Sequence, residues 1–156
     1  MLAAAEDTEM VAARLQAAGL APRFVGTEIG RASTIKMLRS VMVKGMEALT
    51  VECFRAAARA GVAEEVANSL DASEGGLGWA EQTAYNMERM TAHGIRRAAE
   101  MREVAKTLRG LDVAPVMTTG TISWEEEMGA LDLSLDSGTP LAEQLTLIER
   151  ALEKGE

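Results

Sequence analysis

The alternation of apolar and polar positions is most regular between residues 30 and 61, where it predicts one helix of about eight turns at about 3.6 residues per turn. This segment is apolar around most of its circumference. At about 100° per residue, Lys36, Ser40 and Glu47 lie close together on one side. A helix of this kind is usually buried by other helices, and a polar stripe left on it faces a partner, water or a ligand. We therefore expect a buried functional stripe with Lys36 at its centre.

Apolar residues at helical spacing predict further helices over residues 6–18, 62–70, 79–91, 95–109, 116–131 and 140–152. The two segments between 79 and 109 allow either two helices or one helix bent at His93–Gly94. Residues 20–25 predict one short strand without a partner in the chain. The glycine-containing stretch 71–78 is best interpreted as a connector, because it lacks the strand and the lysine of a phosphate-binding loop. The pattern therefore predicts an all-α domain with at most one short strand near the N-terminus.

The composition supports a helical core and excludes several kinds of partner. The 156 residues are 47% apolar and only 3% aromatic, so alanine, leucine, valine and methionine must form the core. The net charge of −8 disfavours binding to nucleic acid or to an anionic membrane surface. No apolar run approaches a membrane span. With one cysteine and one histidine, no metal site is expected, and an unpaired Cys53 buried in the long helix fits a cytoplasmic location.

Lys36 and its neighbours on the long helix are the first candidates for chemistry. A buried lysine can act as an acid or base near neutral pH, although a lysine at a helix edge can also extend to solvent. Arg39 lies one turn further on and could bind a carboxylate with two hydrogen bonds, or form an ion pair with Glu28 or with another helix. Ser40 and Lys44 could contact the same ligand or only solvate this side of the helix.

His93 is the second candidate, because histidine titrates near neutrality and this one precedes a glycine at the expected bend. It could equally be structural, since no serine, cysteine or carboxylate stands at a spacing that specifies a catalytic triad. The run Glu125–Glu127 is most simply a solvated helix face. The methionines are interpreted as flexible core filling.

Two segments resemble a known family: residues 30–40 (GRASTIKMLRS) continued by 44–49 (KGMEAL), and residues 93–105 (HGIRRAAEMREVA). They are similar to the C-terminal helical domain of the 6-phosphogluconate dehydrogenase-like and β-hydroxyacid dehydrogenase superfamily, in its bacterial branch of unknown function. The resemblance covers about residues 6–131. In this superfamily an N-terminal Rossmann domain binds NAD or NADP, and a long interdomain helix enters an all-α domain that holds the substrate and forms the dimer.

The family's glycine-then-lysine pattern falls on Gly30 and Lys36, which implies that Lys36 is the catalytic acid–base group. Arg39, Ser40 and His93 would then orient the substrate. Many members have asparagine where this chain has Ser40, so the usual hydroxyacid substrate does not follow automatically. No glycine-rich fingerprint follows a strand anywhere in the sequence.

The resemblance implies that residues 1–29 are the remnant of the end of a dinucleotide-binding domain and that residues 30–156 form the substrate and dimerisation domain. It implies a homodimer, a small anionic substrate, and NAD or NADP in the complete enzyme, with no cofactor expected to bind this chain alone. The chain would be either a piece of an NAD(P)-dependent oxidoreductase or a stand-alone helical protein. The alternatives are a non-enzymatic helical module for dimerisation or small-anion binding, and an assembly adaptor with an acidic surface.

Overall fold

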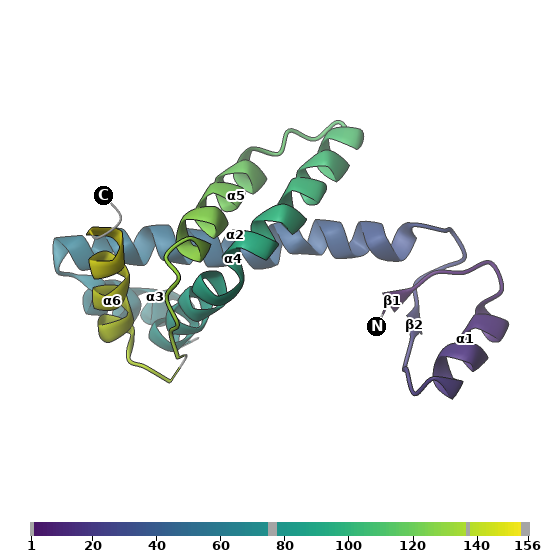
Figure 1. Cartoon of the computed structure of the whole chain (residues 1–156), viewed down its shortest axis with the longest axis horizontal. Helices are drawn as coiled ribbons and strands as arrows, with labels where there is room; N and C mark the ends of the chain where they lie inside the picture. Colours follow the sequence, from purple (N-terminus) through teal and green to yellow (C-terminus); the bar gives the residue numbers. More distant parts are fainter. Residues whose placement is uncertain (1, 75–77, 137, 154–156) are drawn as a thin grey trace. The chain divides into compact units, whose positions relative to one another are not determined.

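The computed structural model describes residues 2–74, 78–136 and 138–153. Figure 1 follows its elements in chain order. The chain divides into two compact units, Met1–Ser40 and Val41–Glu156, and the division falls within one long helix. Each unit is described below by itself. Helices make up most of the described residues, which confirms the predicted all-α class.

The first unit contains a short β–α–β arrangement. Strand β1 (Leu2–Ala3) pairs in parallel with β2 (Arg23–Phe24), and helix α1 (Thr8–Ala17) connects them. The Asp7 side chain caps α1 by accepting a hydrogen bond of 2.9 Å from the backbone N–H of Met10. The expectation of at most one strand, without a partner, is wrong. β1 is only two residues long, so it gives no alternation that a sequence pattern could detect.

Helix α2 (Arg31–Ala60) agrees with the predicted long helix to within one residue at each end. It ends where Gly61 adopts a φ of 72°, a left-handed conformation that glycine takes without steric cost. In the second unit its buried positions carry apolar and charged side chains alike, including Val51, Phe54, Lys44 and Glu47.

Within the described residues, the rest of the second unit consists of four helices, α3 (Ala63–Glu74), α4 (Trp79–Gly110), α5 (Val116–Gly129) and α6 (Leu141–Glu153). Helix α4 is continuous through His93–Gly94, which decides between the two alternatives. Helix α3 extends over residues 71–74, which were expected to belong to a connector, and residues 75–77 of that connector lie outside the described residues.

Helices α4 and α5 cross in close contact where two glycines meet. A Cβ atom on Gly94 would lie 2.1 Å from the backbone oxygen of Glu125, and one on Gly129 would lie 2.5 Å from the backbone nitrogen of Ile95. Both distances are far below van der Waals contact. Gly94 and Gly129 therefore allow the two helices to approach closely, whereas Gly120 has no such neighbour among the described residues.

The core of the second unit is built from α2, α3, α4, α5 and α6. Its fully buried side chains include Phe54, Met87, Met90, Met128 and Ile148. Methionine fills the core at these positions as predicted, but other methionines are exposed, among them Met42, Met46 and Met117.

Two other expectations about burial are wrong. Cys53 is exposed, because it lies on the side of α2 opposite the core. Glu125 is completely buried rather than solvated, because its position on α5 faces α4. In the loop before α6, Leu135 is also buried against the core.

Candidate functional site

Lys36 and Arg39 line one cavity of about 700 Å³ in the first unit. We call it the Lys36 cavity. Helix α2 contributes four residues to it, spaced so that they lie on one side of the helix, and the two-stranded sheet contributes two: Ala32, Ser33, Lys36, Arg39, Leu2 and Arg23. The structure therefore brings together two of the predicted site residues.

The described lining of this cavity carries positive charge only. Arg23, Lys36 and Arg39 are all exposed, and no aspartate or glutamate is among the described lining residues. The hydroxyl group of Ser33 is also available at the wall. Such a set fits a small anion, because a guanidinium holds a carboxylate with two hydrogen bonds while a lysine supplies a mobile charge.

The expectation that Lys36 is buried is wrong. Its side chain is exposed, as are those of Arg39 and Leu38 beside it. The long apolar pattern of α2 suggested burial along its whole length, but the buried positions of this helix begin only at Lys44. Lys36 can therefore reach a ligand from solvent without the cost of desolvating its charge.

The sequence predicts that Ser40 and His93 take part in the same site. The Ser40 hydroxyl donates a hydrogen bond of 3.0 Å to the backbone oxygen of Lys36, within its own helix. Neither Ser40 nor His93 is among the described residues that line the Lys36 cavity. His93 is half-buried in α4, in the second unit, so its role in substrate binding stays a prediction.

Arg23 is the functional candidate that the sequence did not reveal. It lies in β2 and reaches the cavity because β2 pairs with β1. A two-residue strand leaves no periodic signal, and nothing in the local sequence relates Arg23 to Lys36. The only available sign was a cation directly before the apolar pair Phe24–Val25.

The remaining members of the polar stripe form a buried charge network in the second unit. Glu47 of α2 forms an ion pair with Arg97 of α4, and Arg97 also pairs with Glu125 of α5, with 3.1 Å between Nε and Oε1. Lys44 pairs with Glu100 at 2.6 Å. These contacts connect α2, α4 and α5. Within the polar stripe of α2, only residues of the first turns line the Lys36 cavity.

Burial raises the pKa of Glu125 to about 7, although the nearby charges of Arg97 and Lys44 oppose this shift. The side chain is fully buried, and its Oε2 atom has no hydrogen-bond partner among the described residues. A carboxyl group in this environment is close to half-protonated at neutral pH.

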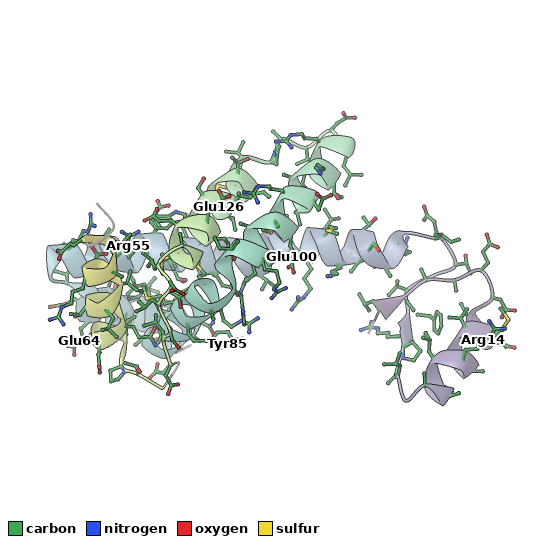
Figure 2. The ribbon with its side chains drawn as sticks, in the orientation of Figure 1. Arg14, Arg55, Glu64, Tyr85, Glu100 and Glu126 are labelled. Atoms are coloured by element: carbon green, nitrogen blue, oxygen red, sulfur yellow. The ribbon has the colours of Figure 1, made fainter. Side chains whose placement is uncertain are left out.

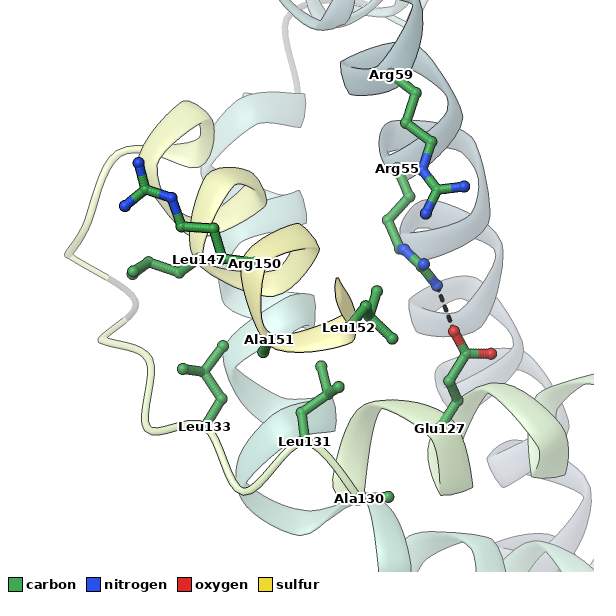
Figure 3. Close-up of a pocket in the computed structure, with 10 residues that line it drawn as sticks. All are labelled: Arg55, Arg59, Glu127, Ala130, Leu131, Leu133, Leu147, Arg150, Ala151 and Leu152. Atoms are coloured by element: carbon green, nitrogen blue, oxygen red, sulfur yellow. Dashed lines mark hydrogen bonds and ion pairs between the residues drawn. The ribbon is translucent and has the colours of Figure 1, made fainter. Parts of the chain in front are cut away.

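Another cavity, of about 880 Å³, lies at α2, α5 and α6 and is drawn in Figure 3. Its charged residues are largely paired with one another. Arg55 donates to Glu127 at 2.6 Å and to Glu149 at 3.0 Å, and it lies over the ring of Trp124. Burial by itself would raise the pKa of Glu149, but hydrogen bonds from Arg55 and Arg59 lower it overall. These interactions hold α2, α5 and α6 together, so we assign Arg55 and Arg59 a structural role.

The turn between β1 and α1 lacks the glycine-rich sequence of a dinucleotide-binding fold. Between β1 and α1, where such a site needs a glycine-rich turn, the chain has Ala4, Ala5, Glu6 and Asp7. The Asp7 carboxylate already occupies the N-terminus of α1, where it would repel a pyrophosphate.

Among the described residues there is no group of three or more histidine, cysteine or acidic side chains that could hold a metal ion. No described helix is both long enough and apolar enough to cross a membrane.

Comparison with known proteins gives matches over most of the chain. Residues 57–128 match a family model described as a domain of unknown function, DUF1932. An uncharacterized 28.5 kDa protein of Methanothermus fervidus is 29% identical over 103 residues, which are 66% of this chain and 41% of that protein.

Two solved structures are similar in fold. A conserved hypothetical protein from Sinorhizobium meliloti 1021 is 34% identical with a TM-score of 0.84, covering 96% of this chain and 51% of that one. A conserved protein of unknown function, described as structurally similar to 3-hydroxyacid dehydrogenases, is 35% identical with a TM-score of 0.71, covering 83% of this chain and 49% of that one. The chain thus spans about half the length of these structures.

These matches confirm the resemblance that the two sequence segments indicated. Residues 57–128 match the DUF1932 family, and the chain is similar to the C-terminal helical domain of the 3-hydroxyacid dehydrogenase superfamily.

Proposed function

We propose that this chain is the substrate-binding and dimerisation part of an NAD(P)-dependent oxidoreductase that acts on a small hydroxyacid-like substrate. The observation that carries the proposal is the Lys36 cavity, where three cations and no described acidic residue surround a space of about 700 Å³. The similarity to a protein described as resembling 3-hydroxyacid dehydrogenases supports the substrate class.

Each cavity residue has a distinct role in this proposal. Arg39 and Arg23 hold the substrate carboxylate, because they approach it from two different elements and fix its orientation. The Nζ atom of Lys36 donates a proton to the substrate oxygen, or accepts one from it, as that oxygen interconverts between hydroxyl and carbonyl. NAD or NADP would supply hydride chemistry, and we propose that it is held outside the residues described here, because the turn between β1 and α1 contains no glycine.

Dimerisation is proposed from the surface of α2 in the second unit. Four exposed residues recur there at helical spacing on one side of the helix: Met42, Met46, Leu49 and Cys53. Met42 keeps 66% of its surface exposed and Leu49 keeps 54%. An apolar stripe of this length favours burial against a second copy of the same helix, because a two-fold axis across it brings the stripe onto itself.

The substrate proposal is tested by calorimetric titration of the chain with 3-hydroxybutyrate and with its neutral amide. We expect the carboxylate to bind more tightly, and the changes Lys36→Met and Arg39→Gln to weaken it by about tenfold or more each, since each removes a charged hydrogen bond. Arg14→Gln is the matched control, because Arg14 is an exposed cation on α1 (Figure 2) that does not line the cavity. Equal binding of acid and amide would contradict the proposal.

The catalytic role of Lys36 needs a separate experiment. The part of the Sinorhizobium meliloti protein that this chain does not cover can be joined to its N-terminus, and hydride transfer to NAD and NADP followed at 340 nm, roughly the absorption of the reduced nicotinamide. We expect Lys36→Met to reduce kcat by at least about a hundredfold, within the range of general acid–base catalysis. An unchanged kcat would show that Lys36 only binds substrate.

A further inference from the structure

A cavity of about 420 Å³ lies between α2 and α4 in the second unit. We call it the amide cavity, after the side-chain amides of Gln82 and Asn86 in its wall. Its volume is typical of sites for small molecules. It shares no described lining residue with the Lys36 cavity, so its argument does not depend on the oxidoreductase proposal.

A chain of hydrogen bonds fixes the two amides. The Nε2 atom of Gln82 donates to Oδ1 of Asn86 at 2.9 Å, and Nδ2 of Asn86 donates to Oγ1 of Thr50 at 2.9 Å. The Thr50 hydroxyl in turn donates to the backbone oxygen of Glu47 at 2.8 Å. Asn86 is only 3% exposed, so its amide is held in one orientation. These bonds use one of the two N–H groups on Nδ2 of Asn86 and one of the two lone pairs on its Oδ1. The second N–H and the second lone pair remain for a ligand.

Aromatic and apolar side chains form the rest of the wall. Trp79 and Tyr85, the latter labelled in Figure 2, are two of only five aromatic residues in the protein, and Tyr85 is its only tyrosine. Val43 and Met46 of α2 complete the apolar surface. The indole N–H of Trp79 is buried and has no acceptor among the described residues. Such a wall suits a flat molecule that stacks on rings and offers a carbonyl oxygen.

The charge of the amide cavity disfavours anions. No lysine or arginine is among its described lining residues, and its one charged residue is Glu47. The Glu47 carboxylate is buried and paired with Arg97, so it is not available to bind a cation from solvent. A neutral ligand is therefore favoured over a charged one, which is the reverse of the preference expected at the Lys36 cavity.

We propose that the amide cavity binds a neutral, planar small molecule with a carboxamide or lactam edge. The edge pairs with the amides of Asn86 and Gln82, and the ring packs between Tyr85, Trp79 and the apolar residues of α2. The remaining N–H and lone pair of Asn86 match the oxygen and N–H of such an edge, whereas a carboxylate offers two acceptors and no donor.

The test uses benzamide and benzoate, which have nearly the same shape but differ in charge and in the presence of a donor. Both are titrated into the whole chain labelled with ¹⁵N. Benzamide is expected to give saturable shifts of the side-chain amides of Gln82 and Asn86 and of the indole N–H of Trp79. Benzoate is expected to leave these signals unchanged at the same concentrations. Failure of benzamide to shift them, or equal shifts by benzoate, would overturn the proposal.

Two substitutions of the same kind, neither of them in the proposed dimer stripe, locate the site. Val43→Trp fills the amide cavity and is expected to weaken benzamide binding by at least about tenfold, whereas Val62→Trp, at a similarly exposed valine that is not among the lining residues, should leave it unchanged. Both valines are exposed, so both variants should fold. Gln82→Ala, at an exposed lining position, should weaken binding without filling the cavity. Equal affinity of the Val43 and Val62 variants for benzamide would contradict the assignment.

Discussion

At the scale of single residues, the charged side chains of α2 differ in burial and therefore in role. Lys36 and Arg39 are exposed at a cavity, while Lys44 and Glu47, one to three turns later on the same helix, are buried in ion pairs. Buried ion pairs contribute little net stability because desolvation costs about as much as the attraction returns, but breaking one is costly. The network around Arg97 therefore mainly specifies how α2, α4 and α5 meet.

Glu125 gives this network a pH dependence that can be measured. Its pKa is about 7 in the folded protein, against an ordinary value of 4.5. The folded state therefore holds the proton more tightly than the unfolded state between these values, and stability falls as the pH rises through this window. The contribution of neutral Glu125 is complete below about pH 4.5 and is lost above about pH 7.

We expect the change Glu125→Gln to remove this part of the pH dependence. Between pH 4.5 and pH 8, the free energy of unfolding of the original protein should fall by about 3 kcal/mol more than that of the variant. This difference corresponds to the size of the pKa shift of Glu125. Urea denaturation at several pH values measures it. Glu126→Gln is the control, since Glu126 is half-buried and pairs with the exposed Arg102. Parallel pH profiles for the protein and its Glu125 variant would contradict the shift.

At the scale of elements, the crossing of α4 and α5 depends on two glycines. At Gly94 and Gly129 the two backbones are so close that neither helix has room for a Cβ atom. The same crossing places Glu125 against α4, which is why this carboxyl group is buried. Close helix contact and the buried charge network are thus two consequences of one packing arrangement.

Alanine substitutions should separate packing from helix propensity. Gly94→Ala must push α5 away and is expected to cost about 3 kcal/mol or more, the upper range for overpacking. Gly120→Ala, in the middle of α5 with no described atom within 4 Å, should be neutral or stabilise by up to about 1 kcal/mol because alanine favours helix. Thermal unfolding measures both. A Gly94 variant with unchanged stability would show that the helices do not approach this closely.

At the scale of the whole molecule, the exposed apolar stripe of α2 has no cover within the described residues. Met42 and Leu49 are more than half exposed although both are large and apolar. The acidic net charge of −8 keeps separate copies apart at long range, so association requires a specific apolar contact of this kind.

We expect the chain to be a dimer in sedimentation at micromolar concentration, and the double change Met42→Glu and Leu49→Glu to make it monomeric. Two carboxylates from each copy would be buried face to face, which is strongly unfavourable. The control is Val116→Glu with Met117→Glu, a pair of equally exposed apolar residues at the start of α5. Dimerisation that survives the α2 change would place the interface elsewhere.

Local sequence patterns were sufficient to assign the class of fold and most of its helices. The period of apolar residues located α2 to within one residue at each end, because helical periodicity depends on local backbone geometry. The segment around Lys36 and the segment beginning at His93 also indicated the superfamily. These signals lie in short continuous stretches of the chain, so the order of residues alone records them.

The burial of polar residues and their pairing, in contrast, depend on how distant segments pack together. Lys36 and Glu47 share a similar position on the helical wheel, yet Lys36 lies near the exposed start of α2 and Glu47 in the packed unit. Arg23 joins Lys36 through a strand pair too short to leave a pattern, and Glu125 is buried because two glycines bring α4 and α5 together. Contacts between distant segments set burial and charge pairing, and helical periodicity carries no information about them.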